Sequence, residues 1–127
     1  MIGVQSTDVP RLWPNIRHLV NAALKHGNGE FEESDIFEAL IKANMQLWWG
    51  DETILITEIV VYPRKKACIG FLAGGNLEQI KKGLPMIELW AKAQGCEDAL
   101  IYGRPGWKRA MADRGYVQKQ VHLRKTL

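Results

Sequence analysis

A carboxylate on an apolar strand face is the first candidate for chemistry in this sequence. Glu58 lies in a segment rich in β-branched residues, 53–62, whose alternation predicts a strand. It shares one face with Ile54, Ile56, Val60 and Tyr62. A lone carboxylate there is costly and favours uptake of a proton, as a general base for an amine requires. The alternatives are an edge position or an ion pair with Arg64 or Arg104.

Two adjacent glycines between a predicted strand and a predicted helix form a second candidate. Gly74, Gly75 and Asn76 precede the helical pattern, and the amides and dipole at a helix N-terminus attract phosphate. The alternative is an ordinary strand-to-helix turn. Gly70, inside the preceding strand, predicts a bulge or close backbone approach, or packing relief beside a tryptophan.

Arg104 and Trp107 follow the predicted strand at residues 98–102. Ligands of α/β sheets bind at the carboxyl ends of parallel strands, so Arg104 is placed to hold an anion and Trp107 to form an apolar wall. In the alternative, Trp107 belongs to the core and Arg104 is a charge leading into a helix.

Metal sites and activated nucleophiles are not expected. The three histidines have no metal-ligand spacing with one another or with the two cysteines. Ser6, Thr7 and Ser34 lie in helix-cap contexts. Cys68 and Cys96 have apolar neighbours and form no Cys-x-x-Cys pair, which argues against a disulfide scaffold and a zinc ribbon.

The composition is that of an ordinary globular chain. Its 127 residues are 46% hydrophobic and 24% charged, which predicts one domain over residues 1–127 and argues against disorder, collagen and coiled coils. No apolar run reaches the length of about 18 residues that suggests a membrane span. The start lacks the pattern of a secretory signal, so the cytoplasm is the expected compartment.

Charge is divided unevenly along the chain. Residues 1–60 carry 4 Lys and Arg against 9 Asp and Glu, whereas residues 61–127 carry 13 against 5. The basic half favours an anionic partner such as a phosphate-bearing coenzyme, or is simply a solvated surface. Nucleic acid is not expected, because no binding motif accompanies the charge.

Hydrophobic periodicity predicts the elements that position these residues. A short edge strand opens the chain, and two amphipathic helices follow, the second capped by Ser34. Residues 45–73 predict a three-stranded antiparallel meander. The remaining elements are a helical region to residue 94, interrupted at Gly83 and Pro85, a strand at 98–102, a helix at 105–114 and a last strand at 116–124.

The predicted fold class is therefore α/β with a mixed sheet, in the order β-α-α-β-β-β-α-β-α-β. A helix separates the strands at 67–73 and 98–102, so these two form a central parallel pair with a right-handed crossover.

This order resembles that of the GNAT N-acetyltransferase superfamily over nearly the whole chain. Supporting segments are Gln46-Leu47-Trp48, Thr57-Glu58-Ile59, Tyr62-Pro63-Arg64, Glu88-Leu89-Trp90-Ala91, Gly95-Cys96 and Gly103-Arg104-Pro105-Gly106-Trp107 through Gly115-Tyr116. The likeness is closest to small divergent members, including some encoded by bacteriophages, for which host cytoplasm or virion is the expected location.

The resemblance implies transfer of an acyl group from acetyl-CoA or another acyl-CoA to an amine, on a small molecule or a protein. It implies that backbone N–H groups of Phe71, Leu72 and Ala73 polarise the thioester. Gly74, Gly75, Asn76 and Arg104 then hold the coenzyme, and Glu58 takes the amine proton.

Departures from the family pattern keep a second hypothesis open. The pyrophosphate loop lacks its leading Arg or Gln and its full spacing, and the family's general-acid tyrosine falls on Met111. Tyr102 is the candidate proton donor in its place. The alternative function is a catalytically inactive binding or structural module of the same fold.

The closing strand suggests an oligomer. The family's seventh strand is missing or supplied by a partner, so residues 116–124 are a candidate unprotected edge. Together with five tryptophans, this favours a symmetric homodimer over a monomer with a charge-blunted edge.

Overall fold

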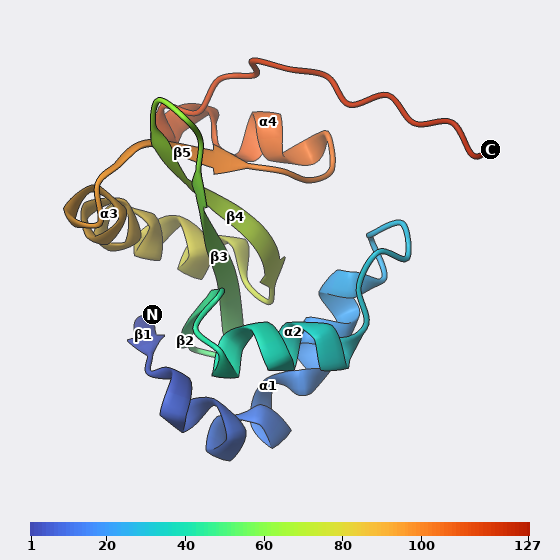
Figure 1. The fold of residues 1–127 in the computed structure, drawn as a ribbon, viewed down its shortest axis with the longest axis vertical. Coiled ribbons are helices and arrows are strands. Elements are labelled where there is room, and N and C mark those ends of the chain that lie inside the picture. The colour runs from blue at the N-terminus through green and yellow to red at the C-terminus, as the bar shows by residue number, and fades with distance from the viewer.

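The computed structural model describes residues 1–127, and a five-stranded mixed sheet lies at its centre (Figure 1). The strands lie side by side in chain order: β1 (Ile2–Val4), β2 (Gln46–Gly50), β3 (Thr53–Val61), β4 (Lys66–Gly74) and β5 (Cys96–Ile101). The first four are antiparallel, whereas β4 and β5 are parallel. The predicted fold class and the predicted parallel pair are confirmed.

Helices cover both faces of the sheet. The helices α1 (Val9–Leu24) and α2 (Glu33–Ile41) pack on one face, over Leu47, Ile54 and Ile56. On the other face, α3 (Leu77–Ala93) packs over Trp48 and Leu55. The adjacent tryptophans of β2 point to opposite faces, as strand alternation predicts: Trp48 contacts Trp90 of α3 edge-to-face, whereas Trp49 packs against the α1 and α2 layer.

Several helix boundaries differ from the prediction in physically clear ways. The helix α2 begins after Glu32, whose N–H donates to the carboxylate of Asp35 at 2.8 Å, so the cap is not Ser34. The helix α3 runs through Pro85 without a break. The predicted helix at 105–114 divides into α4 (Gly106–Ala110) and the 3₁₀ turn η2 (Ala112–Arg114).

The predicted strand at 116–124 is wrong, since this segment has no regular structure. A strand needs a neighbour for its backbone groups, and no backbone–backbone hydrogen bond forms beyond Tyr116. Two side chains hold the segment instead: the Tyr116 hydroxyl donates to Glu88 at 2.6 Å, and Arg124 pairs with Glu30 at 2.7 Å. It therefore runs from the α4 side of the molecule toward the loop between α1 and α2 (Figure 1).

Candidate functional site

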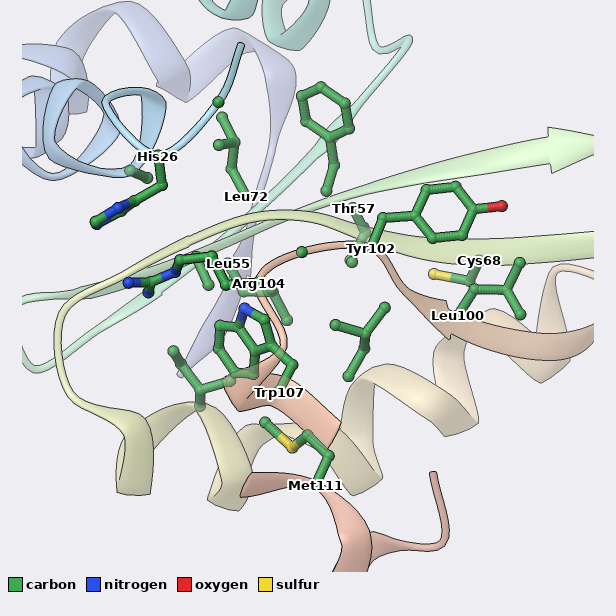
Figure 2. Close-up of a pocket in the computed structure, with 18 of the residues that line it drawn as sticks. His26, Leu55, Thr57, Cys68, Leu72, Leu100, Tyr102, Arg104, Trp107 and Met111 are labelled. Atoms are coloured by element: carbon green, nitrogen blue, oxygen red, sulfur yellow. The ribbon is translucent and has the colours of Figure 1, made fainter. Parts of the chain in front are cut away.

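The candidate site is a cavity of about 490 Å³ that reaches both faces of the sheet at the point where β4 and β5 separate. On the α1 and α2 face it is lined by Leu24, the loop from His26 to Phe31, and Phe71. On the other face it is lined by Leu55, α3 and the α4 region, with Trp107 between Arg104 and Met111 in Figure 2.

A bulge in β4 creates this opening. Thr57 pairs with Gly70 and Ile56 pairs with Leu72, so Phe71 has no opposite residue in β3. On its other side β4 pairs with β5 only as far as Gly70, opposite Ile101. Along Phe71–Gly74, alternate backbone N–H and C=O groups on the β5 side are therefore free for a ligand.

The wall formed by α3 is apolar. Ile80, Leu84, Ile87 and Ala91 repeat at helical spacing and all line the cavity. Met111, which the resemblance matches to a tyrosine, is 1% exposed and also lines the cavity. A thioether has no proton to donate, so Met111 is a packing residue.

One hydroxyl–carboxylate pair lies in this apolar wall. The Tyr116 hydroxyl donates to Oε2 of Glu88 at 2.6 Å, and both residues line the cavity. Burial and then the Glu88 hydrogen bond raise the pKa of Tyr116 above its usual value. Tyr116 is therefore a neutral donor across the physiological pH range.

Two other polar side chains that line this cavity, Thr57 and Cys68, are either already hydrogen-bonded within the protein or unreactive. The Thr57 hydroxyl donates to Gln46 at 2.9 Å and accepts from Nε1 of Trp48 at 3.0 Å. Burial, and then the neighbouring Cys96, raise the pKa of Cys68 to about 11. A protonated thiol is a poor nucleophile, so Cys68 does not provide covalent catalysis.

Basic side chains lie where the cavity meets a second one of about 610 Å³. Arg104 and His26 line both cavities, beside the start of α3 and the end of α1. Arg104 is exposed and forms no ion pair with a carboxylate. Its guanidinium is thus available to an anionic ligand.

The glycine pair is explained by close backbone contacts. A Cβ on Gly74 would lie 2.9 Å from the Leu19 carbonyl oxygen, and one on Gly75 only 2.5 Å from that of Glu52. Gly75 also has φ +107°, a conformation that favours glycine. Both glycines line the second cavity. The close backbone contacts are nevertheless sufficient to explain why both positions hold glycine, without phosphate binding.

The amides at the start of α3 are largely occupied. The Asn76 N–H donates to Thr53 Oγ1 at 3.0 Å, and the Asn76 side chain accepts from the N–H groups of Glu78 and Gln79. Asn76 thus caps the helix and lines neither cavity.

The structure brings most predicted site residues to the cavities, with the exceptions of Asn76 and Glu58. Phe71, Leu72, Ala73, Tyr102 and Arg104 line the first cavity, where Gly74 and Gly75 do not. Glu58 is half-buried, lines neither cavity and forms no ion pair. Strand alternation points it to the face opposite that of Thr57.

Tyr102 lies at the cavity with its side chain half-exposed. Its hydroxyl is directed away from Trp107 and Arg104 (Figure 2). The Tyr62 hydroxyl beside it, together with partial burial, raises the pKa of Tyr102.

Several cavity residues were not predicted as site residues from the sequence. These are Glu30, Glu88, Tyr116, Arg124 and the loop that contains His26. Glu88 did carry a signal, because it stands one turn after Leu84 and next to Ile87 on the apolar stripe of α3. The others come from loops, where spacing carries no such information.

The structure has neither a candidate metal centre nor a helix that could span a membrane. No group of three or more His, Cys, Asp or Glu side chains is arranged to hold a metal ion. No helix has the length and apolar character needed to cross a bilayer.

Comparison with known proteins places the fold. No family model and no curated protein matches the sequence. Among solved structures, a probable acetyltransferase matches with a TM-score of 0.67 at 10% identity, over 99% of this chain and 95% of that one. A possible acetyltransferase from Clostridium difficile 630 matches with a TM-score of 0.62 at 7% identity, over 98% and 94% of the two chains. The protein TTHA1254 from Thermus thermophilus matches with a TM-score of 0.61 at 13% identity, over 100% and 97%.

The sequence identities of 7–13% are too low to transfer a function from these structures to this chain. They extend over nearly the full length of both chains in each comparison, so the likeness concerns the whole fold. The chain therefore has a GNAT-like fold, the fold of acetyltransferase-like proteins.

Proposed function

We propose that this protein transfers an acyl group from an acyl thioester, such as acetyl-CoA, to an amine. The observation that carries the proposal is the cavity at the β4 bulge, which is open to both faces of the sheet. Such a passage lets a thioester and an amine approach one carbonyl carbon from different sides.

The free edge of β4 suits the amide-containing arm of acyl-CoA. The backbone groups along Phe71–Gly74 that face away from β3 have no strand partner. An extended ligand arm with alternating donors and acceptors pairs with such an edge as another strand would. The apolar lining excludes water from the thioester bound there.

The phosphates of the coenzyme need a different cradle from the family's usual one. The amides of Glu78 and Gln79 already donate to Asn76, so they are not free for an anion. Arg104 and His26 line both cavities and supply positive charge beside the start of α3. In the proposal these two side chains hold the phosphates.

The chemical step is direct aminolysis. The amine nitrogen attacks the thioester carbonyl, a C–N bond forms, the C–S bond breaks, and the electron pair leaves on sulfur as a thiolate. The nitrogen loses one proton and the thiolate takes up one, so no oxidant or reductant is needed. Free N–H groups of Phe71–Ala73 stabilise the developing oxyanion, and Glu58 has no part because it lies outside the cavity.

The test is the effect of acetyl-CoA on thermal unfolding, followed by assay of thiol release with a panel of amines. We expect millimolar acetyl-CoA to raise the melting temperature, because a ligand that binds only the native state stabilises it. Arg104→Ala should weaken binding several-fold. The control Lys108→Ala removes an exposed charge one turn away that lines neither cavity. Absence of any shift in the wild-type protein contradicts the proposal.

A second candidate is a binding module of the same fold without transfer activity. The buried Met111 in place of a proton donor and the occupied amides of α3 favour it. It predicts no thiol release with any amine even where acetyl-CoA raises the melting temperature, so the thiol-release assay separates the two functions.

A further inference from the structure

Glu88 is an acidic side chain with no basic partner in the protein. It is half-buried in the cavity wall, and its one side-chain partner is the neutral hydroxyl of Tyr116. No Lys, Arg or His lies within ion-pair distance of it. A carboxylate in an apolar wall is costly unless a positive charge accompanies it.

The basic side chains nearest to this carboxylate either form ion pairs with other acidic residues or lie too far from it to pair. Lys81, on the same helix, pairs with Asp113 at 3.0 Å, and Arg124 pairs with Glu30 at 2.7 Å. Lys92, one turn beyond Glu88, does not line the cavity. His26, Arg104 and His122 line the same cavity as Glu88, but none of them lies within ion-pair distance of its carboxylate.

The wall next to Glu88 is the apolar stripe of α3. From Ile80 to Ala91 it covers twelve residues, whose eleven helical rises add up to about 16 Å. Leu84 and Ile87 precede Glu88 on this stripe, and Met111 faces the same space. A ligand here meets hydrocarbon along its length and a carboxylate near one end.

We propose that this part of the cavity binds a primary amine with an apolar body, whose ammonium group pairs with Glu88. Tyr116 is the positioning residue: its hydroxyl holds Oε2, leaving Oε1 and the remaining lone pairs for the ammonium. In this assignment the subsite is where the acceptor of the transfer reaction binds. That role rests on the proposed function, whereas amine binding itself does not.

The test uses hexylamine and 1-hexanol, which share an apolar body and differ in charge. Binding is measured by calorimetry at constant pH without any coenzyme. We expect hexylamine to bind the wild-type protein at least about tenfold more tightly than 1-hexanol, the factor for one charge-assisted hydrogen bond. Glu88→Gln should remove that difference, while 1-hexanol binding stays unchanged.

Two further variants make the result specific. Glu78→Gln removes an exposed carboxylate from the first turn of the same helix and should leave both affinities unchanged. Tyr116→Phe keeps the Glu88 carboxyl but removes the hydroxyl that holds it, and should reduce the preference for hexylamine over 1-hexanol without abolishing it. Equal binding of the two ligands by the wild-type protein, or equal effects of Glu88→Gln and Glu78→Gln, overturns the proposal.

The proposed function and this subsite fail in distinguishable ways. Acetyl-CoA binding depends on Arg104 and is measured separately from hexylamine binding. If hexylamine binds through Glu88 and acetyl-CoA does not bind, the amine site stands and acyl transfer falls. If acetyl-CoA binds and hexylamine does not, the acceptor site lies elsewhere.

Discussion

Replacement of Gly75 by alanine should destabilise the protein far more than replacement of Gly29. Both residues have positive φ, +107° at Gly75 and +82° at Gly29. A Cβ at Gly29 would meet nothing within 4 Å, whereas one at Gly75 would lie 2.5 Å from the Glu52 carbonyl oxygen and 2.7 Å from Thr53 Cα. The pair therefore separates backbone strain from steric contact.

The size of the effect follows from these two contributions. The left-handed conformation costs a non-glycine residue about 1–2 kcal/mol, and overpacking against backbone adds about 1–3 kcal/mol. We expect a loss of about 2–5 kcal/mol for Gly75→Ala and about 1–2 kcal/mol for Gly29→Ala. With an unfolding entropy of about 2.1 cal/mol/K per residue over 127 residues, 1 kcal/mol lowers the melting temperature by about 4 °C.

Differential scanning calorimetry measures both variants. We expect the melting temperature to fall by about 8–19 °C for Gly75→Ala and by about 4–8 °C for Gly29→Ala. Equal shifts would refute the close packing of the strand-to-helix turn against Glu52 and Thr53, and would restore phosphate binding as the reason for the glycine.

Two other predictions concern the buried thiol and the free strand edge. Because burial raises the pKa of Cys68 from 9.0 to about 11, its contribution to stability is complete below pH 9 and is lost as the pH rises toward 11. Between pH 8 and pH 10.5, the free energy of unfolding measured with urea should decrease less for Cys68→Ala than for the wild type. An equal decrease in the two proteins contradicts this prediction. The outer edge of β5 has no partner, and Val121 and Leu123 are 71% and 87% exposed, so we expect a dimer in which each tail pairs with the partner's β5. Light scattering should then give about twice the 14.4 kDa chain mass and a monomer for a Val121→Lys, Leu123→Lys variant; a monomeric wild type at high concentration contradicts it.

The sheet was largely predictable because its signals are local. Alternation and β-branched residues marked β3, and the helical pattern between β4 and β5 required a parallel pair, as observed. The tail shows the limit of the same reasoning. Its alternation gives residues 116–124 the capacity to form a strand, but a strand also needs a partner, which the sequence of one chain does not specify.

The two carboxylates show why the candidate site was only partly predictable. Glu58 and Glu88 both stand among apolar residues, one on a strand and one on a helix. The sequence tells that each faces an apolar layer, but not which layer contains the cavity. That depends on the side of the sheet on which α3 packs and on the path of the chain after η2, which brings Tyr116 to Glu88.

The opening between β4 and β5 depends on Phe71 more than on Gly70, Gly74 and Gly75, the glycines that the sequence analysis proposed for this region. Gly70 is the last residue of β4 paired with β5, and a Cβ there would make only ordinary contacts at 3.7 Å. One residue later, Phe71 is the extra residue of the bulge, and its ring packs edge-to-face on Phe31 with centroids 4.9 Å apart. A bulge bends its strand, and this bulge is held by the contact of Phe71 with the α1–α2 loop. We infer that β4 therefore separates from β5 at this point and that α3 begins beside the mouth of the cavity. Gly74 and Gly75, which follow the bulge, allow the backbone to pass close to Leu19 and Thr53.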